Sequence, residues 1–143
     1  MAAGPENRFI KSINTKLKGI IYCEKMHNPY RGGTADVWYS GRHDAWIEYK
    51  WINSVPKKGV LIPDLGPLQL EWCTNRFNEG RKVFVVVGCP LGAIIFSNPA
   101  EWHDGLRTPV VLSKPDYIVW LTGEVNGCIN EIKSRGRKRK LDI

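Results

Sequence analysis

The sequence predicts an α/β fold in a single domain, with a mixed β-sheet flanked by helices. Apolar residues recur at helical spacing in residues 5–19, and residues 67–80 begin with Pro and end with Gly, as helices often do. Residues 82–88 form a continuous β-branched apolar run, typical of a buried central strand. The chain has 143 residues, enough for one compact domain with a substantial core. No repeat or low-complexity linker divides it, so we expect residues 1–132 to form the domain and residues 133–143 a basic, flexible tail.

The N-terminal half is predicted to contain one helix, one short strand and one β-hairpin. The helix has Pro in its first turn, Gly at its end and apolar residues three and four positions apart. Two segments of β-type composition, TADVWY and AWIEYKW, flank the turn-like SGRHD, as is typical of a hairpin. The predicted elements are, in order, a helix at residues 5–19, a strand at 20–24, and hairpin strands at 34–39 and 45–51.

The C-terminal half is predicted to begin with an irregular connection and then to alternate between helices and strands. Pro67 is favoured at a first helical position, and Gly80 is a typical helix end. Asn98 before Pro99 is typical of a helix start. The predicted elements are a helix at residues 67–80, strands at 82–88 and 92–96, a short helical turn at 98–105, and one interrupted helix or two short ones within 113–134.

Composition narrows the class of protein. The net charge of +7 and the sequence pI of about 9.4 favour a polyanionic partner. The four cysteines are scattered without a CxxC pair, so we expect small buried hydrophobes in a reducing compartment and not a zinc site or a disulfide framework. The N-terminus lacks an apolar signal segment, and no run approaches membrane-spanning length. These features predict an intracellular protein, cytoplasmic or nuclear, without membrane contact.

Three charged residues gather on the predicted hairpin. Successive strand side chains alternate between faces, so Glu48 and Lys50 share one face and Tyr49 points to the other. A hairpin loop with an odd number of residues places Asp36 opposite Glu48, with Cβ atoms about 4.5–5.5 Å apart. Two such carboxylates repel unless a cation lies between them, and Mg²⁺ favours carboxylate and water oxygens. The pattern therefore predicts a magnesium site, with a solvated charge pair on an exposed hairpin as the alternative.

The ordered elements, with D…ExK on the second and third strands, resemble the PD-(D/E)XK nuclease superfamily. Ala35 stands where the family often has Pro. The segment GPLQLEWCTNRFNEGRKVFVVVG resembles the VRR-NUC branch, in which a helix bearing Gln and Trp precedes a hydrophobic strand. The resemblance covers residues 5–88. It implies a restriction-endonuclease-like core and a metal-dependent deoxyribonuclease.

The resemblance also implies roles for particular residues. Asp36, Glu48 and the backbone carbonyl of Tyr49 would hold Mg²⁺, for which Mn²⁺ could substitute, and Lys50 would stabilise the attacking hydroxide and the transition state. Glu6 would hold a second metal ion or its water shell, the alternative being an acid favoured by the helix dipole. Gln69 is the carried-over polar residue, the alternative being an ordinary helix-face amide. The expected site residues are Asp36, Glu48, Tyr49, Lys50, Glu6 and Gln69.

Basic residues around this core predict a nucleic-acid surface. Phosphate contacts give affinity without sequence preference. The sequence has no evident recognition helix or zinc finger, so branched, flapped or four-way DNA is favoured over a sequence-specific site, and endonuclease over exonuclease action. The tail residues also fit a nuclear-localisation signal. The residues expected to contact phosphates are Arg31, Arg42, Lys57 and Lys58 in loops, and Lys133, Arg135, Arg137, Lys138, Arg139 and Lys140 in the tail.

The small size of the chain suggests a homodimer or a catalytic module that works with accessory chains. The alternative function is a non-catalytic nucleic-acid-binding protein that retains the nuclease fold. Two facing acids beside a phosphate argue against that alternative, because a binding module has no need of them.

Overall fold

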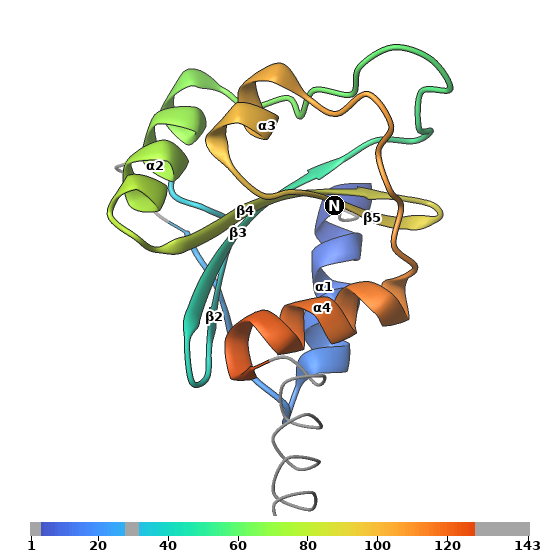
Figure 1. Cartoon of the computed structure of the whole chain (residues 1–143). Helices are drawn as coiled ribbons and strands as arrows, with labels where there is room; N and C mark the ends of the chain where they lie inside the picture. Colours follow the sequence, from blue (N-terminus) through green and yellow to red (C-terminus); the bar gives the residue numbers. More distant parts are fainter. Residues whose placement is uncertain (1–3, 28–31, 128–143) are drawn as a thin grey trace, which may run out of the picture.

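A five-stranded mixed β-sheet lies between two layers of helices (Figure 1). The computed structural model describes residues 4–27 and 32–127. The strands lie in the sheet in the order in which they occur in the chain, so β1 and β5 are the edges. The predicted α/β class and the flanked mixed sheet are confirmed.

Only one neighbouring pair of strands in this sheet is parallel. A parallel pair needs a crossover connection, which the helix α2 (Pro67–Asn78) supplies between β3 and β4. The other pairs are antiparallel. The strands are β1 (Tyr22–Lys25), β2 (Val37–Ser40), β3 (Asp44–Trp51), β4 (Lys82–Cys89) and β5 (Gly92–Phe96).

Each face of the sheet has its own hydrophobic core. The helices α1 (Pro5–Leu17) and α4 (Lys114–Asn126) cover one face, and α2 and α3 (Pro99–Asp104) cover the other (Figure 1). The continuous apolar run of β4 is explained by this arrangement, since its residues alternate between the two cores. The first core contains Phe9, Ile10, Ile13, Leu17, Tyr49, Tyr117 and Leu121; the second contains Cys73, Val83, Val85, Val87, Phe96 and Trp102.

The register of the β2–β3 hairpin decides where the acids of the D…ExK pattern lie. The end pair of the hairpin is Ser40 with Asp44, which leaves a turn of three residues, 41–43. The loop is therefore odd, as the prediction required. Val37 pairs with Ile47, so Asp36, one residue before β2, lies opposite Glu48.

The predicted elements agree with the structure except at their ends. The strand expected at residues 20–24 is Tyr22–Lys25, and the first hairpin strand begins at Val37. The last described helix ends at Asn126, where Gly127 takes a φ of 98°, a conformation that residues with a Cβ rarely adopt. The remainder of the segment predicted as helical lies outside the described residues. Among the described helices, none is long and apolar enough to cross a membrane.

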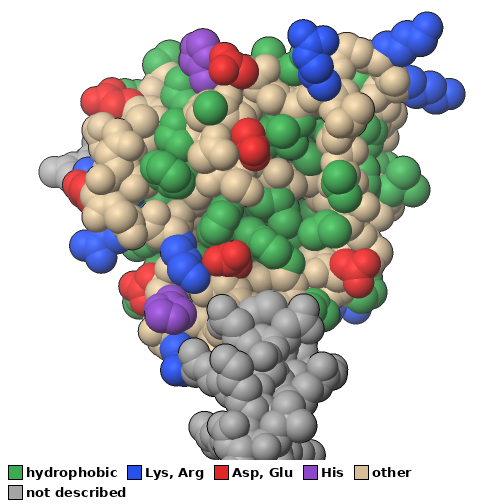
Figure 2. Space-filling model, in the orientation of Figure 1, with side chains coloured by type: hydrophobic (Ala, Val, Ile, Leu, Met, Phe, Trp, Pro, Cys, Tyr) green, Lys and Arg blue, Asp and Glu red, His purple; other side chains and the backbone are tan. Residues whose placement is uncertain are grey.

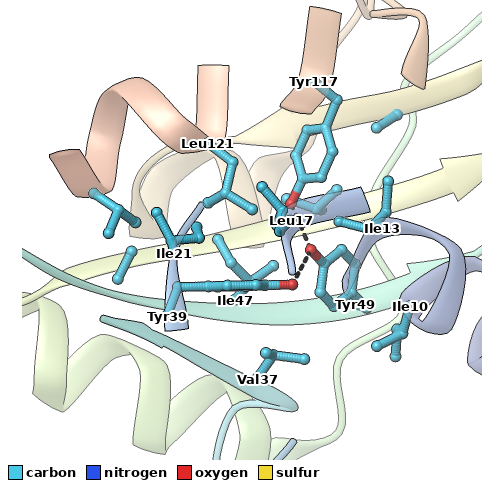
Figure 3. Packing of buried hydrophobic residues seen from close by; sticks show 14 of the residues in the cluster. Ile10, Ile13, Leu17, Ile21, Val37, Tyr39, Ile47, Tyr49, Tyr117 and Leu121 are labelled. Carbon is cyan, nitrogen blue, oxygen red and sulfur yellow. Dashed lines mark hydrogen bonds between the residues drawn. The ribbon is translucent and has the colours of Figure 1, made fainter. Parts of the chain in front are cut away.

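Three buried tyrosine hydroxyls form a hydrogen-bonded chain behind β3 (Figure 3). The Tyr49 hydroxyl lies 2.8 Å from that of Tyr39 and 2.7 Å from that of Tyr117. The Tyr39 hydroxyl also donates to Asn14 Oδ1 of α1 at 2.7 Å. Burial raises the pKa of all three phenols, so each hydroxyl stays protonated and able to donate. The chain thus ties β3 to α1, β2 and α4.

Tyr49→Phe is expected to destabilise the fold more than Tyr117→Phe. The first substitution removes the central hydroxyl and leaves that of Tyr117 buried without its partner, which costs about 1–3 kcal/mol. The second removes an end of the chain, and Tyr49 keeps its bond with Tyr39, so we expect about 0.5–1.5 kcal/mol. Urea unfolding of both variants measures the difference, and equal losses would contradict a central role for the Tyr49 hydroxyl.

Candidate functional site

Asp36 and Glu48 converge on the face of the sheet that α2 covers. The Tyr49 N–H donates to Asp36 Oδ2 at 2.8 Å, which fixes the Asp36 carboxylate against β3. The two carboxyl groups are close enough for each to shift the pKa of the other. Glu48 is 1% exposed, and its Oε1 has no hydrogen-bond partner. A buried carboxylate oxygen without a partner is costly, so this position needs a proton or a cation.

The electrostatics of the pair follow from burial and like charge. Burial, and then repulsion from Asp36, raise the pKa of Glu48 to about 9, although the Lys50 ammonium acts in the opposite direction. Burial also raises the pKa of Asp36, partly offset by the hydrogen bond from the Tyr49 N–H. Both acids therefore resist ionisation in the absence of a cation, as expected for two carboxyl groups in one buried site.

Gln69 joins the acids to the lysine. Its Nε2 donates to Glu48 Oε2 at 3.0 Å, and its Oε1 accepts from Lys50 Nζ at 3.0 Å. The same Oε1 accepts from the Gly66 N–H at 3.0 Å, closing the first turn of α2. One amide thus caps the helix and orients two side chains of β3. Gln69 contacts both Glu48 and Lys50, and its role in the site stays a prediction.

A close approach of the backbone brings the N-terminus of α2 to the site. Gly33 has a φ of 98°, and a Cβ there would collide with the backbone of Leu68. Only glycine fits this contact, which packs the segment before Asp36 against the helix turn that carries Gln69. The Met26 N–H donates to the Asp36 carbonyl at 2.8 Å and holds the other side of the segment.

Lys50 lies beside the acids and reaches the surface. Its Nζ is 3.7 Å from Glu48 Oε2, and its side chain is 21% exposed. It lines a hollow of about 460 Å³ together with Glu6 and Asn7 of α1. The ammonium can therefore contact the buried carboxylate and a molecule that enters from solvent.

Glu6 lies near the other acids without joining them as a ligand cluster. Burial, and then the charge of Asp36, raise the pKa of Glu6, while Lys50 and Lys25 lower it. Within residues 4–27 and 32–127, no group of three or more His, Cys, Asp or Glu side chains is placed to hold one metal ion. Glu6 therefore interacts with Asp36 and Glu48 through its charge. A role for Glu6 at a second metal ion stays a prediction.

The donor set fits a hard divalent cation. Carboxylate and carbonyl oxygens are what Mg²⁺ and Mn²⁺ prefer, and Glu48 Oε1 is a buried oxygen still in need of a positive partner. In a strand, the N–H and C=O of one residue point the same way, so the Tyr49 carbonyl is directed toward the Asp36 side, where its N–H already donates. The Tyr49 side chain points into the opposite core.

The residues expected to contact phosphates are dispersed. Arg42 lies in the hairpin turn, six residues along from Glu48 and roughly 20 Å away at strand spacing, so it does not border the acids. Lys57 and Lys58 are exposed in the segment that connects β3 to α2. Arg31 and the basic tail, including Lys138 and Arg139, lie outside the described residues. On the face in Figure 2, Lys and Arg side chains stand apart at the periphery while hydrophobic side chains gather in the middle.

Two groups near the acids escaped the sequence analysis. Lys25, the last residue of β1, donates to Asn7 Oδ1 at 3.1 Å. Its positive charge lowers the pKa of Glu6 and of Asp36. The β1–β2 register places Lys25 opposite Val37, but the intervening loop is too long to give that register from sequence. Cys73 of α2 is buried near the acids: burial, and then the charges of Glu48 and Asp36, raise the pKa of its thiol to about 12. Cys73 and Cys89 are buried as expected, and Cys23 is partly buried.

Comparisons with known proteins give limited information. No protein-family model matches the chain, and no curated protein matches it. Among solved structures, the chain is similar to Archaeoglobus fulgidus Hjc, a Holliday junction resolvase from an archaeal hyperthermophile. The TM-score is 0.48 and the sequence identity 16%, over 71% of this chain and 94% of that chain. A similarity at this level supports no conclusion about the site, whose properties follow from its own residues alone.

Glu48→Gln is expected to stabilise the protein in the absence of divalent ions. The substitution keeps the shape of the side chain, removes the free-energy cost of protonating Glu48 on folding at neutral pH, which its raised pKa implies, and supplies an amide donor, so we expect a gain of about 1–3 kcal/mol. Thermal unfolding in a chelating buffer should show a midpoint higher by about 2–8 °C. Glu71→Gln, on an exposed acid of α2, is the matched control and should leave the midpoint unchanged.

The same measurement with Mn²⁺ tests the ion site. The parent protein should gain stability with added Mn²⁺ because the ion binds the folded state, whereas Glu48→Gln should lose this response. A lower midpoint for Glu48→Gln in chelator, or an undiminished response to Mn²⁺, would show that the buried pair does not need a cation.

Proposed function

We propose that this protein is a metal-dependent nuclease that hydrolyses phosphodiester bonds in DNA. The observation that carries the proposal is the buried Asp36–Glu48 pair, with its unpartnered Oε1, beside an ammonium that Gln69 orients. A buried pair of like charges lowers stability unless it serves a bound cation. The resemblance of the D…ExK pattern to PD-(D/E)XK nucleases, closest in appearance to the VRR-NUC branch, supports the same activity.

Asp36, Glu48 and the Tyr49 carbonyl would hold Mg²⁺, or Mn²⁺ in its place. Such an ion, when bound, lowers the pKa of water and polarises a phosphoryl oxygen, which are the two requirements of phosphodiester hydrolysis. The chain prepares this position before any ion arrives, since the Tyr49 N–H fixes Asp36 and the Gln69 amide fixes Glu48.

Lys50 supplies positive charge where the phosphate becomes more negative. Gln69 Oε1 holds its Nζ at 3.0 Å, so the ammonium is positioned before the substrate binds. Such preorganised donors stabilise the transition state more than the ground state. Gln69 acts through the two side chains that it orients and is therefore a positioning residue.

The substrate that fits best is DNA of particular structure, cut internally. The net charge of +7 favours a polyanion. Neither the sequence nor the described structure contains a recognition helix or zinc finger for reading bases, so branched, flapped or four-way DNA is proposed in preference to a specific sequence. The described residues of one chain form one such site, so we propose that cutting two strands needs a homodimer or an accessory chain.

Cleavage assays on Asp36→Asn and Glu48→Gln test the activity. Linear, single-stranded, flapped and four-way DNA are incubated with and without Mg²⁺ or Mn²⁺. The parent protein should cut only with the metal, and both variants should lose cleavage, by at least about 10²-fold, while binding DNA as well or better. Stronger binding is expected because each variant removes a negative charge next to the phosphate. Binding without cleavage by the parent protein would favour the non-catalytic alternative.

Lys50→Ala is expected to slow cleavage without removing the ion. Its ammonium acts on the developing charge, so kcat should fall by about 10²–10³-fold, while Mn²⁺ still raises the unfolding midpoint. Lys50→Arg should restore little activity, because a planar guanidinium does not replace a compact ammonium held by one amide oxygen. Lys82→Ala, on a lysine bound to Glu124 away from the site, is the control. Equal activity of Lys50→Ala and the control would exclude a catalytic lysine.

A further inference from the structure

A long hollow of about 1000 Å³ runs between α1 and the edge strand β1. One side of α1 forms a wall at helical spacing, with Asn7, Lys11 and Asn14, and Lys18, the residue after the helix, extends it. The opposite wall is the strand β1 and the segment before it. The outer edge of β1 pairs with no other strand among the described residues.

The charges of this groove have a single sign. Lys11, Lys18 and Lys25 line it, and none of the described Asp or Glu side chains does. Lys11 and Lys18 are exposed, and neither forms an ion pair with a described residue. The neighbouring acid Glu24 accepts a hydrogen bond from the Tyr22 hydroxyl at 2.9 Å and does not line the hollow. The groove is therefore suited to a negatively charged occupant.

The groove opens at the candidate nuclease site. Asn7 lines both this hollow and the smaller one that contains Glu6 and Lys50. Lys25 stands at the junction, bound to Asn7 and acting on the charge of Asp36. Asn7 and Lys25 thus connect the groove to the hollow that contains Lys50.

The floor of the groove is apolar. Ile10 and Ile21 are buried beneath it, and Ile20, at its wall, is 52% exposed. The flat faces of unpaired bases can cover such a surface, whereas a duplex keeps its base faces stacked inside and presents phosphates. Grooves that bind single strands combine positive charge with aromatic side chains on which bases stack, and Tyr22, which is 55% exposed, lines this groove.

We propose that the α1–β1 groove binds an unpaired strand of the nucleic acid whose phosphodiester lies at the Asp36–Glu48 site. The inference rests on the proposed function and narrows its substrate to DNA with a single-stranded flap or extension. Lys11 and Lys18 are seven residues apart, about 10 Å along the helix. With about 3.4 Å between nucleotides even in a stacked strand, they contact different phosphates.

Binding in a chelating buffer tests the groove without cleavage. The probes are a fluorescent duplex with a single-stranded extension and the same duplex fully paired. The double variant Lys11→Ala, Lys18→Ala should bind the extended probe roughly tenfold more weakly, and the slope of log K against log salt should fall by about 1.4, since each lost contact with a single strand contributes about 0.7. Its affinity for the fully paired probe should stay unchanged.

Lys16→Glu is the matched control. Lys16 is an exposed lysine of α1 that does not line the groove, and this substitution changes the net charge by the same two units as the double variant. It should keep the affinity and the salt slope of the parent protein on the extended probe. Equal losses for the control and the double variant would mean a general effect of charge and would overturn the proposal.

The outcomes separate this inference from the proposed function. Loss of cleavage in Asp36→Asn, together with normal binding of the extended probe by Lys11→Ala, Lys18→Ala, would support the nuclease proposal and contradict strand binding in the groove. If binding of the extended probe depends on Lys11 and Lys18 but the parent protein cleaves no DNA, strand binding in the groove would be supported and the nuclease proposal contradicted. Sedimentation tests a protein occupant: a parent dimer that Ile20→Asp dissociates, with unchanged binding by the lysine variant, would assign the groove to a second copy.

Discussion

The hydrogen bond from the Tyr49 N–H to Asp36 Oδ2 is the interaction on which the site depends. It holds the Asp36 carboxylate, one residue before β2 begins, against the backbone of β3. The side chain of the same Tyr49 is tied into the opposite core by two other tyrosines (Figure 3). One residue thus links the position of the carboxylates to the packing of α1 and α4, and a shift of β3 by one residue would reverse every face.

The buried Asp36–Glu48 carboxyl pair lowers the stability of the fold in the absence of a cation. Glu48 is enclosed, and only one of its oxygens has a partner. The fold tolerates this because Gln69 satisfies Glu48 Oε2, Lys50 and the first turn of α2 together. The remaining oxygen is where a cation would be bound, so lower stability without metal and affinity for metal have the same origin. The α1–β1 groove adds the opposite property, positive charge without acids, where a strand would approach.

The sequence could predict most of the fold because its signals are local. Pro67 and Gly80 bracket α2 within two residues, and the apolar run of β4 identified a buried interior strand. Strand alternation placed Glu48 and Lys50 on one face, and the length of the SGRHD turn placed Asp36 opposite Glu48. The position of Arg42 in the hairpin suggested that it lies close to the acids, but the extended strand β3 carries the turn away from them.

Alternation by itself placed Glu48 and Lys50 on one face of β3. The sequence placed Asp36 opposite Glu48 only for a hairpin loop with an odd number of residues, and the observed register has such a loop. Only the tertiary structure decided what surrounds these three residues. The hydrogen bonds of Gln69 with Glu48 and Lys50 require α2 to dock with its N-terminus over β3. The hydrogen bond between Lys25 and Asn7 requires the first turn of α1 to lie beside the end of β1. Helix docking is set by the burial of side chains far apart in the chain, such as Phe9 against Tyr49 and Tyr117, and no local pattern encodes those distances.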